Sequence, residues 1–147
     1  MIHVPDTNVL LRFANRADAQ HAVVLSAVRK LKASGDKIYI LPQTCVEFWN
    51  VCMRPTARNG YSFTVRRTNH SLRLVERIFP LLSDEARVHQ EWRKLVLGFG
   101  VSGVQVHDAR IVAAMLVHQI THILTFNTSD FARYSSLGIV AVDPNKV

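Results

Sequence analysis

The sequence lacks the features that would place it among membrane, secreted or zinc-binding proteins. No apolar run approaches the roughly 18 residues that cross a bilayer, and no basic segment precedes an apolar one near Met1, as in a signal peptide. The two cysteines, Cys45 and Cys52, stand seven positions apart, so on one helix their Cα atoms lie roughly 10 Å apart. That distance excludes a disulfide, and the pair also lacks the spacing of zinc ligands. We expect free thiols in a protein of a reducing, cytoplasmic compartment.

Acidic residues are scarce in this chain. Its 147 residues include 11 acidic and 18 basic ones, which gives a formal net charge of +7. A basic protein of this size often binds a polyanion. Apolar residues make up 48% of the chain, enough to bury a core, and the length is that of one domain. We predict a single globular domain over residues 1–147 that does not enter a membrane.

Motifs of several other classes are also missing. The chain has no glycine-rich phosphate loop and no local signature of a Ser-His-Asp hydrolase. A phospho-acceptor receiver domain, which is also an α/β fold, would carry adjacent acids after its first strand and a lysine after a late one. Here Asp6 is followed by Thr7 and Asn8, and no lysine comes directly after Thr125. These residues disfavour a receiver domain.

Short apolar runs alternate with longer amphipathic stretches along the chain. The predicted strands are the run before Asp6, Lys37–Leu41, Thr121–Phe126 and Ile139–Val142, with Ile78–Leu82 as an edge strand or a loop. The predicted helices are Val9–Phe13, Ala17–Ser34, one opened by Pro42, Thr64–Ile78, Ser83–Phe99 and Val106–Val117. This alternation predicts an α/β fold with a mostly parallel sheet of four to five strands and helices on both faces.

Carboxylates recur where such a sheet binds ligands, beyond the carboxyl ends of its strands. Asp6 and Asp130 closely follow predicted strands, and Asp108 lies in the first turn of a buried helix, on its apolar stripe. Glu47 lies opposite the apolar stripe of its helix, so it faces either water or a polar cleft. Carboxylates that converge repel one another unless a cation lies between them. Such all-oxygen ligands suit Mg²⁺ or Mn²⁺.

Each of these acids also has a purely structural interpretation. Asp6 is a good cap for the helix that follows it, and Asn127 with Asp130 resembles a capping box. Glu47 could be an ordinary solvated side chain, and Asp108 lies in a first turn, where the helix dipole favours an anion. For Asp108 we favour function over capping, because a lone carboxylate on the apolar stripe of a buried helix is unusual unless it is paired or binds a metal.

A basic stripe follows a loop rich in helix-breaking residues. On the predicted helix Thr64–Ile78, one face carries Arg66, His70, Arg73 and Arg77, at steps of four, three and four. Such a stripe could follow the phosphate backbone of RNA, which makes Arg66, Arg73 and Arg77 candidate RNA-binding residues. The alternative is a solvated helix face, the commoner meaning of a run of charges.

Four segments in this order resemble the motifs of PIN-domain nucleases: Val4–Leu11, Pro42–Phe48, His107–Ala114 and Leu124–Phe131. The length and the lack of any appended domain are most similar to the VapC toxins of bacterial type II toxin–antitoxin pairs. The resemblance covers the whole chain. Each motif alone is weak, but four motifs in order are quite specific.

This resemblance implies a PIN-like three-layer sandwich that acts as a Mg²⁺- or Mn²⁺-dependent endoribonuclease. By motif position, its catalytic and metal-binding residues would be Asp6, Glu47, Asp108 and Asp130. Asp6 and Asp108 would be the direct metal ligands, with Thr7 and Asn127 as supporting polar residues. The family also implies a homodimer, and inhibition by a small cognate VapB-like antitoxin. His107 is no part of the pattern, and we expect a satisfied or surface histidine.

An antitoxin needs a surface to bind, and aromatic residues offer one. Phe13, Trp49, Tyr61 and Phe63 would add to an apolar patch that an amphipathic antitoxin helix could cover. The alternative is that they belong to the core, above all Trp49, which shares a stripe with Phe48. Two other functions stay open: a housekeeping PIN-domain RNA-processing nuclease, and a catalytically silent RNA- or partner-binding module on the same fold.

Overall fold

The computed structural model describes all 147 residues, and its centre is a small parallel sheet. The strands are β1 (Ile2–Pro5), β2 (Lys37–Ile38), β3 (His122–Leu124) and β4 (Val140–Val142), in the order β2-β1-β3-β4. His3 of β1 pairs with Ile38 on one side and His122 on the other. All three strand pairs are parallel, which confirms the predicted α/β fold.

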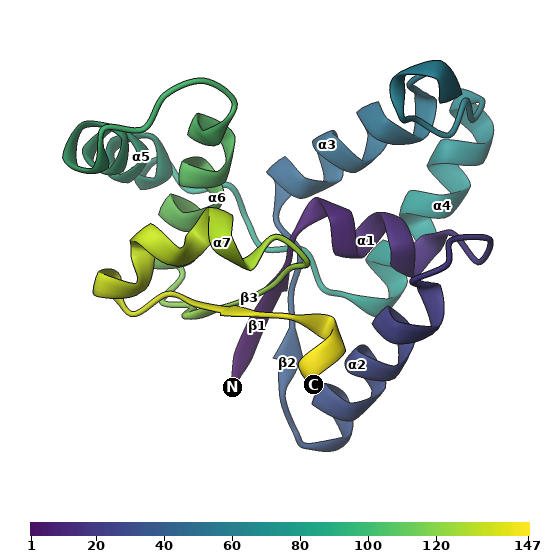
Figure 1. Ribbon diagram of the computed structural model, residues 1–147, viewed down its shortest axis with the longest axis horizontal. Helices are drawn as coiled ribbons and strands as arrows, with labels where there is room; N and C mark the ends of the chain where they lie inside the picture. The colour runs from purple at the N-terminus through teal and green to yellow at the C-terminus, as the bar shows by residue number, and fades with distance from the viewer.

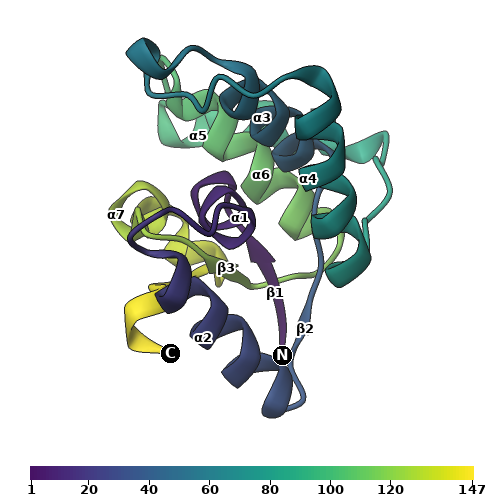
Figure 2. The same ribbon diagram turned by 90° about the vertical axis from the view of Figure 1, so that its right-hand side faces the viewer.

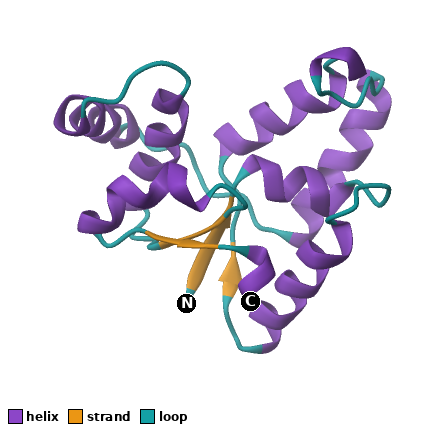
Figure 3. Cartoon of the chain, in the orientation of Figure 1, coloured by secondary structure: helices purple, strands orange, loops and turns teal.

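Helices make up most of the remaining chain, as Figure 3 shows. They are α1 (Thr7–Ala14), α2 (His21–Ala33), α3 (Pro42–Met53), α4 (Val65–Ile78), α5 (Arg87–Phe99), α6 (Gln105–Val117) and α7 (Thr128–Phe131). Short 3-10 helices cover Thr56–Arg58, Ala132–Leu137 and Pro144–Lys146. Helices α1 to α4 form one group and α5 to α7 another (Figure 1), and the view in Figure 2 shows both groups beside the strands.

Each helical group packs on its own face of the sheet. Ile123 and Leu124 are neighbours on β3, and successive side chains of a strand point to opposite faces. Ile123 belongs to a core cluster that includes Ile111 and Met115 of α6, whereas Leu124 belongs to a second cluster that includes Leu10 of α1. The sheet therefore has helices on both faces, as predicted.

Helix α6 is the most deeply buried helix of its group. Ile111, Val112, Ala113 and Met115 are fully buried, which agrees with a sequence that is apolar nearly all round. Trp92 of α5 donates its indole N–H to the Val106 carbonyl at 2.8 Å and so links the two helices. No helix in the structure combines the length and the apolar composition needed to cross a membrane.

The structure decides one open alternative and shifts two predicted helix starts. Ile78–Leu82, predicted as an edge strand or a loop, is a loop with one bridge between Ile40 and Leu81, because α4 continues to Ile78 and Pro80 has no N–H to donate. The helix predicted over Ala17–Ser34 begins only at His21. The helix predicted from Ser83 begins only at Arg87. The Ser83 hydroxyl donates to the Glu85 carboxylate at 2.8 Å and caps no backbone N–H group. The residues from Ser83 to Ala86 therefore lie outside the helix.

Candidate active site

Asp6 lies at the carboxyl end of β1, where it caps α1 and also joins a cluster of acids. Its Oδ1 accepts the backbone N–H of Thr7 at 2.8 Å. Its Oδ2 accepts from the Thr125 hydroxyl at 2.9 Å and from the Asn8 amide at 3.0 Å. The side chain is only 7% exposed. Asp6 therefore both caps α1 and lies within the acidic cluster, and three donors fix its orientation.

Burial is the largest cause of the raised pKa of Asp6. The hydrogen bonds from Thr125 and Thr7 favour the ionised form and oppose that rise, while the charges of Glu47 and Asp130 add to it. Because the pKa of Asp6 rises overall, its hydrogen-bond donors do not fully offset burial and the charges of the neighbouring acids. A cation beside Asp6 would favour the ionised carboxylate and lower this pKa.

Glu47 faces the acidic cluster rather than open solvent. Its Oε2 accepts from the Thr7 hydroxyl at 2.5 Å, and its Oε1 accepts from the Gln43 amide at 2.9 Å. Helix α3 opens with Pro42 in its first turn, a position that needs no backbone donor, and Glu47 follows one turn later. Of the two alternatives drawn from the sequence, the structure favours the polar cleft.

Asp108 lies in the first turn of α6 and is partly buried. Burial raises its pKa to about 7, and the charges of Asp6, Asp130 and Glu47 contribute to the rise, while Arg133 opposes it. All four predicted carboxylates are therefore close enough to influence one ionisation.

Asp130 lies on α7, the short helix that follows β3, and its charge acts on both Asp6 and Asp108. The capping-box alternative fails, because the Asn127 side chain caps nothing and is exposed. Asn127 supports the site through its backbone instead, since its N–H donates to the Thr125 hydroxyl at 3.0 Å. Thr7, the other predicted supporting residue, holds Glu47 directly.

Sequence reasoning missed several residues that hold the carboxylates in place. Asn8 and Thr125 hydrogen-bond Asp6, Gln43 hydrogen-bonds Glu47, and the charge of Arg133 acts on Asp108. Asn8 carries a weak signal, because it follows Asp6 by two positions at a helix start. The others come from distant segments, and no local spacing distinguishes them from ordinary polar residues.

The donor set fits a hydrated divalent cation better than a closed metal cage. No three His, Cys, Asp or Glu side chains are arranged to enclose one ion. Mg²⁺ does not need such a cage, because it keeps several waters and binds through one or two carboxylates together with substrate phosphates. The observation that favours a cation here is the crowding of four carboxylates, since the charges of Asp6, Asp130 and Glu47 add to burial in raising the pKa of Asp108 to about 7.

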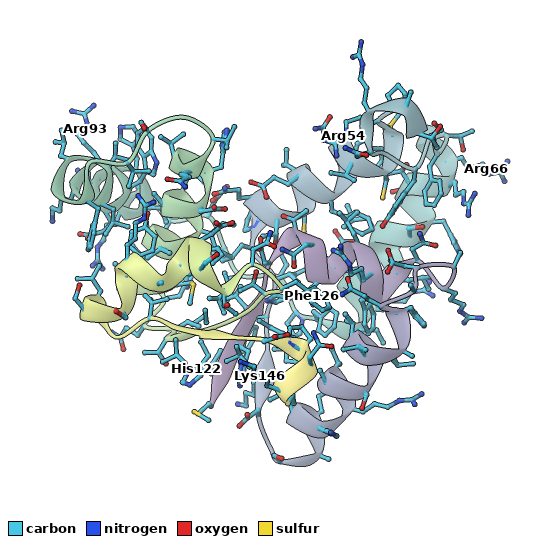
Figure 4. The ribbon with its side chains drawn as sticks, viewed as in Figure 1. Arg54, Arg66, Arg93, His122, Phe126 and Lys146 are labelled. Atoms are coloured by element: carbon cyan, nitrogen blue, oxygen red, sulfur yellow. The ribbon has the colours of Figure 1, made fainter.

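The basic stripe of α4 lies away from this cluster. Arg66, Arg73 and Arg77 are all exposed. In Figure 4, Arg66 is at the outer margin of the molecule, whereas Phe126, which follows β3, is near the middle. Arg77 lines a groove between α1, α2 and α4.

The aromatic residues expected to form an exposed patch are only partly exposed. Phe13 packs on Phe79 with ring centroids 4.9 Å apart, and Tyr61 packs on Phe63 at 5.3 Å. Trp49 lines a shallow hollow on α3. Phe13, Tyr61 and Phe63 therefore pack against the second core cluster more than they form one open surface, and Trp49 is itself half-buried.

Both cysteines are unpaired in the structure, as expected. Cys52 is buried and Cys45 partly buried, and burial raises the pKa of each thiol to about 11. Neither thiol is a reactive nucleophile at neutral pH, because the thiolate is the reactive form.

A comparison with protein families covers nearly the whole chain. The family model described as the PIN domain matches residues 3–137. The chain belongs to the PIN domain family. The resemblance drawn from four sequence segments is confirmed, although no curated protein sequence matches the chain significantly.

Three solved structures with a similar fold come from bacteria. VapBC2 from Rickettsia felis, bound to a DNA fragment from its promoter, is 15% identical, with a TM-score of 0.69 over 97% of this chain and 98% of that one. VapBC-1 from nontypeable Haemophilus influenzae is 15% identical, with a TM-score of 0.71 over 99% and 100%. VapC20 from Mycobacterium tuberculosis, a sarcin-ricin loop cleaving toxin, is 20% identical, with a TM-score of 0.63 over 95% and 97%. At these identities the likeness establishes the fold.

Proposed function

We propose that this PIN domain is a Mg²⁺- or Mn²⁺-dependent endoribonuclease and the toxin of a type II toxin–antitoxin pair. The observation that carries the proposal is the convergence of four carboxylates, from the end of β1 and from α3, α6 and α7, because the charges of the other three all act on Asp108. Membership of the PIN family and the net charge of +7 support a nuclease that binds RNA. Asp6 and Asp108 are the proposed direct ligands, with Glu47 and Asp130 completing the site.

A bound divalent cation would lower the pKa of a coordinated water and neutralise charge that develops on the phosphate. The chain's own residues prepare the site for this chemistry. Thr125 and Asn8 hold the Asp6 carboxylate, and Thr7 holds Glu47. Asp108 carries a proton in part of the molecules at neutral pH, and we expect cation binding to release it.

The test is to incubate the purified protein with total RNA, with Mg²⁺ or with chelator, and to map the ends produced. We expect defined new ends with Mg²⁺ and none with chelator. The Asp6→Asn variant is the control for a contaminating nuclease. If Asp6→Asn cleaves as well as the unaltered protein, or if no RNA is cleaved with either metal, a catalytically silent binding module is the better reading.

The groove between α1, α2 and α4 is the proposed binding site for an antitoxin segment. It encloses about 520 Å³ and is lined by six apolar residues and by Arg16, His21, Arg29 and Arg77, with no acid among them. An acidic amphipathic helix would match both its apolar floor and its charge. A toxin-antitoxin complex from Klebsiella pneumoniae has a similar fold, at 20% identity and a TM-score of 0.61, which supports such a partner.

The acidic partner would be the product of a small reading frame beside this gene, co-expressed and co-purified with the chain. Reversing charge in the groove with Arg29→Glu and Arg77→Glu should weaken that complex at least about tenfold, because two attractive contacts become repulsive. Lys94→Glu on α5 is the matched control outside the groove. Undiminished binding by the double variant would move the antitoxin to another surface.

A homodimer is also part of the proposal. Leu97 and Val104, in and after α5, are 76% and 82% exposed, more than any other large apolar side chains. A second copy would cover them in a symmetric contact. Light scattering should show a dimer that Leu97→Asp and Val104→Asp convert to a monomer.

A strictly monomeric chain without an acidic partner would favour the alternative function, a housekeeping PIN-domain nuclease. We propose a cytoplasmic location for either function, because the free thiols favour a reducing compartment.

A further inference from the structure

Gln43 is the side chain that connects the two helical groups beside the acidic cluster. It lies in the first turn of α3, within the group formed by α1 to α4. Its Nε2 donates to Oε1 of Glu47 at 2.9 Å and to the carbonyl oxygen of His107, in α6, at 2.8 Å. Its Oε1 accepts from Arg110, also in α6, at 3.2 Å. No other side-chain hydrogen bond joins α3 to α6.

These partners leave only one possible orientation for the Gln43 amide. The two N–H groups of the amide face two acceptors, and its carbonyl oxygen faces a guanidinium, which can only donate. Exchanging the nitrogen and the oxygen would set oxygen against both the Glu47 carboxylate and the His107 carbonyl. Both N–H groups of the amide therefore have acceptors, and its oxygen has one donor. The positive charge of Arg110 beside this oxygen strengthens donation from the amide nitrogen.

The position of each partner gives this contact a consequence for the site. Gln43 and Glu47 are four residues apart, which places them on one face of α3. His107 directly precedes Asp108 in the first turn of α6. One amide group therefore touches the Glu47 carboxylate and the backbone that carries Asp108. Although Leu41, just before α3, shares a core cluster with α6, every side-chain hydrogen bond between the two helices that carry Glu47 and Asp108 involves Gln43 (Figure 1).

We propose that Gln43 is a positioning residue, whose amide orients the Glu47 carboxylate and holds it at a fixed distance from Asp108 so that both can act on one divalent cation. The proposal rests on the metal-dependent function proposed above. Groups that hydrogen-bond a metal ligand orient it and tune its affinity, and their loss typically costs 10- to 100-fold in metal affinity or activity. Gln43 would hold Glu47 in this way while Arg110 holds Gln43.

A merely structural link between α3 and α6 would have a different signature. Its loss would lower the unfolding temperature of the metal-free protein and leave metal affinity unchanged once the chain is folded. A positioning residue would instead change metal affinity and kcat. It would leave the KM for RNA nearly unchanged, because Gln43 hydrogen-bonds Glu47, His107 and Arg110 and none of the α4 arginines that are candidates for RNA binding.

The experiment compares the unaltered protein with Gln43→Met, which keeps the length of the side chain and removes its donors and acceptor. Gln90→Ala, an exposed glutamine of α5 without a side-chain hydrogen bond, is the matched control. Calorimetry with Mn²⁺ alone, without RNA, gives the metal Kd. We expect Gln43→Met to raise this Kd about tenfold and Gln90→Ala to leave it within twofold. On an RNA oligonucleotide, Gln43→Met should lower kcat with little change in KM.

A second variant keeps the test possible if Gln43→Met does not fold. Arg110→Met removes the donor to the Gln43 carbonyl together with an exposed ion pair to Asp84 at 3.9 Å, and it leaves both Gln43 hydrogen bonds to Glu47 and His107 in place. We expect a smaller rise in the Mn²⁺ Kd, of about threefold. An unchanged Kd in a folded Gln43→Met protein overturns the proposal. If Gln43→Met does not fold, an unchanged Kd in Arg110→Met overturns it. If the unaltered protein binds Mn²⁺ with a Gln43-dependent affinity but cleaves no RNA, the proposed nuclease function fails and the positioning role stands.

Discussion

The two ends of the central strands differ in how their charged groups are compensated. At the amino end, Asp36 accepts from the Met1 amino group at 2.6 Å and lies 3.0 Å from Nε2 of His3. These hydrogen bonds hold the pKa of Asp36 below its ordinary value. At the carboxyl end, burial and like charge raise the pKa values of Asp6 and Asp108. One end pairs opposite charges, and the other gathers charges of the same sign.

This difference separates a structural cluster from a candidate functional one. A paired carboxylate such as Asp36 stabilises the fold when it is ionised, because its neighbours favour the charged form. The carboxylates at the other end destabilise the fold when they are all ionised without a cation. Charges of the same sign crowded at one sheet edge cost stability, and such an arrangement is expected where binding or catalysis needs these charges together.

The largest expected effect is on activity, and it should be confined to the carboxyl end. Asp6→Asn and Asp108→Asn should each lower Mg²⁺-dependent RNA cleavage by more than about a hundredfold, because each removes a proposed metal ligand. Asp36→Asn should leave the rate within about twofold. Initial rates on a labelled RNA at saturating Mg²⁺ measure both. A comparable loss in Asp36→Asn would show that the two ends do not differ in function.

The next effect concerns stability in the absence of metal. The pKa of Asp108 is raised to about 7, so between about pH 4 and pH 7 the folded chain binds a proton that the unfolded chain has lost. Stability should therefore fall as pH rises through this window. Asp108→Asn should remove that part of the fall and raise the unfolding temperature at pH 8 by a few degrees.

The measurement is the unfolding temperature of the unaltered protein and of Asp108→Asn from pH 4 to 8, in chelator. Subtracting one curve from the other removes the contribution of titratable groups that both proteins contain. Saturating Mn²⁺ should stabilise the unaltered protein more than Asp108→Asn. Parallel curves for the two proteins across the whole range would contradict a raised pKa at Asp108.

The opposite sign is expected at the amino end, with a smaller size. Because the pKa of Asp36 is lowered, its contribution to stability is present above the ordinary aspartate value of about 4 and disappears as pH falls through the depressed pKa. Asp36→Asn should lower the unfolding temperature at pH 7 by about 2 °C, a small shift because the pair is near the surface. Once the pH falls below the depressed pKa of Asp36, the two proteins should unfold together. A stabilised Asp36→Asn protein at pH 7 would remove the contrast between the ends.

The smallest effect is expected in RNA binding outside the acidic cluster. Changing Arg66, Arg73 and Arg77 to Gln should weaken RNA binding a few-fold at physiological salt. It should also flatten the slope of log affinity against log salt by up to about 2, because released counterions scale with neutralised phosphates. The matched control removes three cations near the amino end of the sheet, Lys30, Lys32 and Lys37. Equal slopes for both triple variants would make the α4 stripe an ordinary solvated face.

Local patterns were sufficient to predict the order of the main strands and helices and the acids that follow strands. Asp6 after β1 and Asp130 after β3 could be placed at one sheet edge, because parallel strands have their carboxyl ends together. The sequence of α6 is apolar on nearly all sides, which predicted that the helix is buried. The same pattern showed that Asp108 is an unusual residue for this position. Capping signals were less reliable, since the first turn predicted at Ser83 does not form.

Only the tertiary structure decided which polar residues serve the acids. Glu47 could have faced water, and its orientation toward Asp6 depends on how α3 packs beside α1. Thr125 meets Asp6 across 119 positions of sequence, and Gln43 meets His107 across 64. Such contacts arise from the packing of whole helices and strands, so no local pattern predicts them. The sequence determined where carboxylates stand along the chain, and the packing of two helical groups on one sheet determined which neighbours hold them together.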